Sequence, residues 1–95
     1  MVIHVRKLVS GADTADQGLK LFPYIRDAFR SEKTVTVSFD GLQTATSSFV
    51  KTAMVGLLND MAFSEIKARL KIVDSTRQIN QMIKSRFERE AMAHA

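Results

Sequence analysis

Four hydroxyl side chains lie close together in the segment GLQTATSSFV, residues 41–50, where Thr44, Thr46, Ser47 and Ser48 stand between two apolar stretches. A hydroxyl at the start of a helix can cap the free backbone N–H groups, hold a bound phosphate, or accept a covalent one. Capping is the commonest role, so we first expect Thr46 or Ser47 to cap a helix. Phosphorylation would instead add about −1.5 to −2 charges and three acceptor oxygens, enough to abolish docking of a partner.

The elements on either side would hold this segment at the edge of a sheet. Residues 34–39, TVTVSF, alternate apolar and hydroxyl side chains, which predicts a strand, and Asp40-Gly41 supplies turn chemistry after it. Apolar side chains then recur at intervals of three and four residues, which predicts one helix from about residue 48 to residue 61. Loops at the carboxyl ends of parallel strands often form binding sites, so we expect one here.

Two further strand and helix pairs complete the pattern. Residues 2–9 and 69–74 are short and apolar, which predicts two strands. The first strand is followed by a helix that we expect to begin near Phe22, because Pro23 is disruptive beyond a first turn. The second is followed by a helix over residues 75–95, with N-cap candidates at Asp74, Ser75 and Thr76. The order β-α-β-α-β-α predicts a small α/β domain with a largely parallel or mixed sheet and packed helices.

Length and composition indicate one domain over residues 1–95, with 45% hydrophobic and 25% charged residues. The chain has no cysteine, which excludes disulfides and thiolate sites and is compatible with a reducing compartment. Charged residues interrupt the apolar run at the N-terminus, and no stretch approaches the ~20 apolar residues of a membrane span. We therefore expect a cytoplasmic protein that is not embedded in a membrane.

The segment VTVSFDGLQTATSSFVKTAMVGLL, residues 35–58, resembles the central part of the family of STAS-like domains of unknown function. Members show a strand that ends in an F-D-G or similar turn, followed by S-S-F at the start of a helix. GLKLFPYIRDAF resembles the first helix of the family, and LKIVDSTRQINQMIKSRF resembles its last strand and helix. The resemblance runs from about Gly18 to Phe87 and implies a STAS-like fold.

That family is similar to the STAS domains of anti-sigma factor antagonists, in which the corresponding turn reads D-S-S-G and a serine is phosphorylated by a partner kinase. The similarity implies Ser48 as the phospho-acceptor, with Ser47 as a second candidate. Thr46 and Phe49 stand where that motif has aspartate and glycine, which alters what a kinase or a partner's backbone would meet. STAS-like members often occur beside histidine-kinase-type ATPase domains, so the resemblance implies a partner of that class or a serine kinase.

The residues and the resemblance together predict a non-catalytic regulatory domain that needs no cofactor. We expect it to bind a regulatory protein through the edge formed by Asp40, Gly41, Thr44, Thr46 and Phe49. The sequence leaves open whether the domain works alone, as a homodimer, or beside an ATPase.

A serine-dependent hydrolase is one alternative. Attack by Ser47 or Ser48 requires a base, and the histidines are His4 and His94, the second near the C-terminal end. The chain lacks G-x-S-x-G, a P-loop and G-x-G-x-x-G, and its histidines and carboxylates lack metal-ligand spacing. Catalysis, nucleotide binding and a metal site are therefore not expected.

A small nucleic-acid-binding module is the other alternative. The net charge is +4, and the C-terminal third is biased toward basic residues, namely Arg69, Lys71, Arg77, Lys84, Arg86 and Arg89. Acidic residues are interleaved among them at Asp74, Glu88 and Glu90, and no aromatic platform accompanies them. A solvated helix face is therefore the preferred interpretation.

Overall fold

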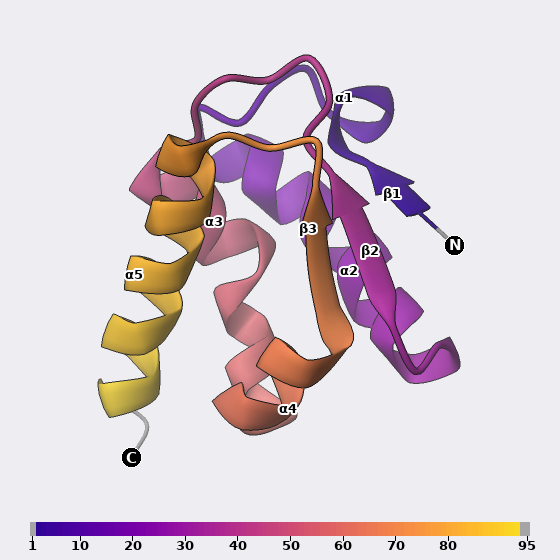
Figure 1. Ribbon diagram of the computed structural model, residues 1–95, viewed down its shortest axis with the longest axis vertical. Helices are drawn as coiled ribbons and strands as arrows, with labels where there is room; N and C mark the ends of the chain where they lie inside the picture. The colour runs from indigo at the N-terminus through magenta and orange to yellow at the C-terminus, as the bar shows by residue number, and fades with distance from the viewer. Residues whose placement is uncertain (1, 94–95) are drawn as a thin grey trace.

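The computed structural model describes residues 2–93, with side chains through residue 92. The elements follow one another along the chain as strand β1 (Val2–His4), helix α1 (Val5–Leu8), helix α2 (Ala15–Ser31), strand β2 (Val35–Ser38), helix α3 (Ser47–Ala53), the 3-10 helix η1 (Val55–Asn59), helix α4 (Phe63–Arg69), strand β3 (Leu70–Val73) and helix α5 (Arg77–Ala93) (Figure 1).

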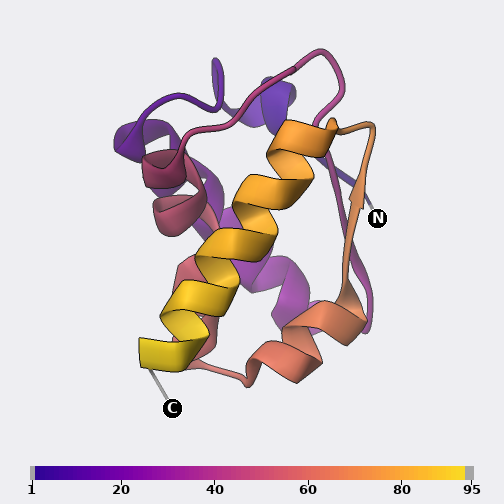
Figure 2. The ribbon, with the colours of Figure 1, turned by 60° about the vertical axis from the view of Figure 1, so that its left-hand side comes forward.

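The three described strands are all parallel and lie in the order β1-β2-β3. Right-handed crossovers that always advance in the same direction put their helices on the same face of a sheet. Accordingly α2 and α3, which belong to the two crossovers, lie on one side of the sheet, and α5, which follows the last strand, lies on the same side (Figure 1, Figure 2). The predicted α/β fold is confirmed, in a two-layer form.

The core lies between the sheet and the helices. Ile3, Val35 and Val37 point inward from the strands and are buried, because side chains alternate between the faces of a strand. Helices α2 and α5 contribute Leu21 and Ile79, which are fully buried. Each such side chain contributes about 1.5–3 kcal/mol to folding, so this layer stabilises the small sheet.

Helix α2 begins at Ala15, so the prediction of a start near Phe22 is wrong. Thr14 and Gln17 form a capping box, in which Thr14 Oγ1 accepts from the Gln17 N–H at 3.2 Å and Gln17 Oε1 accepts from the Thr14 N–H at 3.0 Å. This cap and the buried stripe offset the roughly 3 kcal/mol that Pro23 costs inside the helix.

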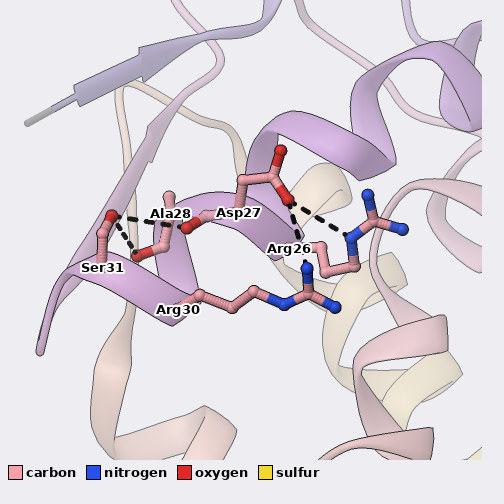
Figure 3. Close-up of polar contacts among 5 residues, drawn as sticks. All are labelled: Arg26, Asp27, Ala28, Arg30 and Ser31. Carbon is pink, nitrogen blue, oxygen red and sulfur yellow. Dashed lines mark hydrogen bonds and ion pairs between the residues drawn. The ribbon is translucent and has the colours of Figure 1, made fainter.

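The outer face of α2 carries surface ion pairs. Asp27 accepts from Arg26 at 3.4 Å and lies 3.9 Å from Arg30, while the Ser31 hydroxyl donates to the backbone carbonyls of Asp27 and Ala28 (Figure 3). Such exposed pairs are worth about 0–1 kcal/mol, so the buried face holds this helix in place.

No helix within residues 2–93 combines the length and apolar character needed to cross a membrane.

Two other element predictions are corrected. The first strand ends at His4, and α1 follows it directly, where a strand to residue 9 was predicted. The helix predicted over residues 48–61 is divided at Met54 into α3 and the 3-10 helix η1. Three-residue apolar spacing suits both kinds of helix, so the pattern could not separate them.

The segment between η1 and β3 contains α4, a helix that the sequence pattern did not predict. The third strand was predicted over residues 69–74 and is observed at Leu70–Val73. The last helix starts at Arg77 and is described as far as Ala93, so the final residues of the predicted range lie outside the described part of the chain.

Candidate functional site

The turn after β2 is built on Gly41. The Phe39 carbonyl accepts from the Leu42 N–H at 2.9 Å, and Gly41 has φ of 84°. A positive φ at the third position of a four-residue turn suits glycine, as the Asp40-Gly41 pair predicted. The Arg6 side chain occupies the space that a Cβ at position 41 would need, so the turn and α1 are packed together.

Threonine hydroxyls cap the long helices α2 and α5 and the short helix α3 at the carboxyl edge of the sheet. Oγ1 of Thr14, Thr46 and Thr76 each accepts from the N–H three residues later, at 3.2, 3.2 and 3.3 Å. Thr46 is therefore the cap of α3, and Ser47 is the first helical residue. Sequence reasoning left three candidates for the cap of α5, and Thr76 is the one that caps it.

The segment between the turn and α3 is held from both sides. On the α5 side, the Ala45 N–H donates to Gln78 Oε1 at 2.9 Å, Gln78 Nε2 donates to the Ala45 carbonyl at 3.1 Å, and Thr76 Oγ1 donates to the Gln43 carbonyl at 2.7 Å. On the other side, Thr46 donates through N to the Ala12 carbonyl and through Oγ1 to the Asp13 carbonyl, at 3.0 and 2.9 Å. The loop between α1 and α2 and the loop between β2 and α3 run side by side above the sheet (Figure 1). The backbone of this segment is thus fixed in place.

The two serines have different surroundings. Ser47 is half-buried, and its hydroxyl accepts from Arg86 Nη1 at 3.2 Å. Arg86 also pairs with Glu90 at 3.0 Å, and its Nε is buried without a hydrogen-bond partner. Ser48 is exposed, and within the described side chains its hydroxyl makes no hydrogen bond, although its carbonyl accepts from Thr52 Oγ1 at 3.1 Å. The Ser48 hydroxyl is therefore the less engaged of the two.

The residues predicted to form the contact edge divide into two groups. Asp40, Gly41, Thr44 and Thr46 are all exposed at the carboxyl edge of the sheet. Phe49 was also assigned to this edge, and that assignment is wrong for its side chain, which is fully buried. A residue at the third position of α3 points back toward the core, where Phe49 packs with the helices. The exposed edge is therefore polar.

Strand order also changes the expected shape of this edge. Crevices at the carboxyl ends of parallel strands form where the strand order reverses, and the order β1-β2-β3 contains no reversal. A cleft of about 280 Å³ nevertheless lies at the carboxyl ends of β1 and β2, and its lining includes His4, Ser38 and the edge residue Asp40. Asp40 thus joins the contact edge to this cleft, whereas Gly41, Thr44 and Thr46 do not line it.

Several residues that build the edge were missed by sequence reasoning. The capping box of Thr14 and Gln17 follows a recognisable T-x-x-Q pattern and could have been found. Gln78 and Arg86 contact residues 33 and 39 positions away, and no local signal marks such pairs.

Among residues 2–93, no group of three or more His, Cys, Asp or Glu is arranged to hold a metal ion. His94 lies outside the described residues.

One of the comparisons with known proteins identifies a family. A family model described as a STAS-like domain of unknown function (DUF4325) matches residues 17–80, more than half of the 95-residue chain. The chain belongs to this family. The STAS-like match contains the whole segment from β2 through α3, including the Thr46 cap and both serines. A search of curated proteins finds no match to the chain, and a search of solved structures finds none.

Proposed function

We propose that this STAS-like domain is a non-catalytic regulatory domain that binds a partner protein through its exposed edge, Asp40, Gly41, Thr44, Thr46 and Ser48. Phosphorylation of Ser48 then controls the binding. The observation that carries the proposal is the exposure of Ser48, whose hydroxyl is free of hydrogen bonds among the described side chains, next to a segment whose backbone is fixed on both sides.

A fixed backbone suits such a contact surface because a partner need not pay the entropy of ordering it. Hydrogen bonds from Gln78, Thr76 and Thr46 hold the edge, while the side chains of Thr44 and Ser48 remain exposed. A phosphate on Ser48 would change the charge at this surface by about −1.5 to −2 without breaking any of these bonds. The partner, and not the fold, would then respond to the modification.

The geometry favours Ser48 over Ser47 as the acceptor. A kinase must bring the serine hydroxyl into its own active site, which suits an exposed side chain. Ser47 is half-buried and its hydroxyl accepts a hydrogen bond from Arg86, so its modification would compete with the Arg86–Glu90 pair. The partner that we propose is a histidine-kinase-type ATPase or a serine kinase, in line with the family resemblance.

The nucleic-acid alternative is weakened by the use of two of its basic residues inside the fold. Arg69 donates to three backbone carbonyls at the end of α2, and Arg86 pairs with Glu90 and Ser47. The hydrolase alternative is weakened by the position of His4, which lies opposite Ser38 in the sheet and lines a cleft that includes neither Ser47 nor Ser48.

The modification is tested by intact-mass and peptide mass spectrometry of the protein isolated from its own cells under several growth conditions. We expect a single added phosphate on Ser48 that disappears in Ser48→Ala and persists in Ser47→Ala. Absence of phosphate under every condition, or its presence on Ser47 alone, would contradict the proposed control.

The contact surface is tested separately by photo-cross-linking in the same cells. A benzoylphenylalanine at position 44 should cross-link one specific protein, and Ser48→Asp should reduce that cross-link at least fivefold. The same probe at Leu19, which is exposed on α2, is the matched control. Equal cross-linking from positions 44 and 19 would show that the edge is not the contact surface.

A further inference from the structure

An apolar groove of about 330 Å³ lies between α4, β3 and α5, on a different part of the surface from the contact edge. Its floor includes Phe63, Ile72, Ile83 and Phe87, and the rings of Phe63 and Phe87 stack with centroids 5.6 Å apart. None of the residues of the segment 40–48 lines it. The groove lining therefore does not include the proposed regulatory serine, Ser48.

The groove runs beside a strand edge that lacks a neighbour. Within the described sheet, β3 pairs with β2 alone, so its other edge has no strand neighbour, and α5 lies on that side of β3 (Figure 1). The side chains of Leu70 and Ile72, on the helix-covered face of β3, line the groove. The Val73 carbonyl accepts from the Phe39 N–H at 3.1 Å, so the polar backbone groups of Val73 point toward β2. Because these groups alternate along a strand, the N–H and C=O of Ile72 point the other way, toward the open edge.

Two lysines stand at the rim of the groove without a carboxylate partner. Lys67 and Lys84 are exposed, and neither forms an ion pair within the described residues. The Lys67 ammonium lies 5.4 Å from the centre of the Phe63 ring, which keeps this charge next to the apolar floor. Glu88 is the one acidic residue in the lining, so the rim carries a net positive charge.

From these three features we propose that the groove binds an extended acidic segment of a partner protein, which adds a strand to the outer edge of β3. The partner's backbone would bond to the free N–H and C=O of Ile72, and its alternate apolar side chains would enter the groove. Carboxylates flanking those apolar residues would meet Lys67 and Lys84. The proposal goes beyond the regulatory edge and does not depend on phosphorylation of Ser48.

A second copy of this chain is a poorer occupant than an acidic partner. Pairing of two β3 edges would bring two sets of Lys67 and Lys84 together, and like charges across an interface oppose association. The chain as a whole carries a net charge of +4, which adds to the repulsion. Opposite charge on the partner removes this cost and also speeds the encounter.

The experiment uses a display library of random twelve-residue peptides selected on the intact protein. We expect enriched peptides with two apolar residues at positions i and i+2, flanked by Asp or Glu. A resynthesised peptide should bind at least tenfold more weakly to Lys67→Glu/Lys84→Glu than to the unmodified domain. The variant Lys20→Glu/Lys51→Glu makes the same charge change at exposed positions elsewhere, and should weaken binding less than threefold.

Strand addition has a second readout that leaves the protein unchanged. Methylation of a peptide nitrogen whose N–H bonds to β3 should abolish binding of the peptide. Methylation of the neighbouring nitrogens, which point away from β3, should leave binding intact. Backbone amide shifts in the complex should be largest at Leu70–Val73 and small at residues 44–48.

The proposal would be overturned by the absence of any enriched peptide, by enriched peptides without acidic residues, or by equal binding to both lysine variants. A dimer in sedimentation that Lys67→Glu/Lys84→Glu alone dissociates would assign the groove to a second copy and would also overturn it. Thermal melting of both double variants checks that exposed-site changes leave the fold intact.

Discussion

The side-chain amide of Gln78 on α5 forms two hydrogen bonds with the backbone of Ala45, which lies 33 residues earlier in the chain. The Gln78 side chain and the Ala45 backbone each donate one of these hydrogen bonds and accept the other, as paired residues of neighbouring strands do. It ties the segment that leads into α3 to the first turn of α5, and so determines where the proposed contact edge lies.

Gln78→Ala should destabilise the domain by about 1–3 kcal/mol, because the N–H of Ala45, a buried residue, would lose its partner. Urea unfolding measures this change in the free energy of unfolding. Gln81→Ala, at an exposed position of the same helix, is the control and should change stability by less than about 0.5 kcal/mol. Equal effects of the two substitutions would show that the pair with Ala45 contributes nothing.

Thr46→Ala should cost about 1 kcal/mol, because it removes the cap of α3 and the hydrogen bond to the Asp13 carbonyl. Thr46→Ser keeps the hydroxyl and should recover most of that loss. Thr44→Ala, two residues earlier at an exposed position, removes the same side chain without removing a cap. Thermal melting compares the three variants, and a Thr44→Ala effect as large as that of Thr46→Ala would argue against the cap.

Gly41→Ala should destabilise the turn for two separable reasons. The left-handed backbone costs a residue with a Cβ about 1–2 kcal/mol, and the new Cβ would overlap the Arg6 side chain. In an Arg6→Ala background, Gly41→Ala should therefore cost less than in the unmodified protein, leaving the backbone cost alone. Chemical denaturation of the four proteins gives this comparison. Identical costs in both backgrounds would mean that Arg6 moves aside freely.

Arg69→Lys should be destabilising although it keeps the charge. Arg69 Nη2 donates to the carbonyls of Phe29 and Glu32 at 2.6 and 2.8 Å, and its Nε donates to the Lys33 carbonyl at 3.0 Å. A lysine presents a single ammonium and cannot reproduce this fork, so we expect a loss of about 1–3 kcal/mol. Arg77→Lys, at an exposed position, is the matched control in the same urea titration. Full stability of Arg69→Lys would contradict this role.

Features that depend on neighbouring residues could be predicted from the sequence. Alternation in residues 34–39 predicted β2, Asp40-Gly41 predicted a turn, and the hydroxyls before the second apolar helix included its cap, Thr46. These signals are short-range, because a strand period, a turn or a cap is set by side chains within a few positions of one another.

The tertiary structure decided what those signals left open. It buried Phe49, gave Ser47 a hydrogen bond from Arg86, and left Ser48 exposed, although all three residues are adjacent in the chain. It also opened the groove beside β3, whose lining is drawn from α4, β3 and α5. These outcomes depend on which distant elements pack together and at what angle, and local residue spacing carries no information about either.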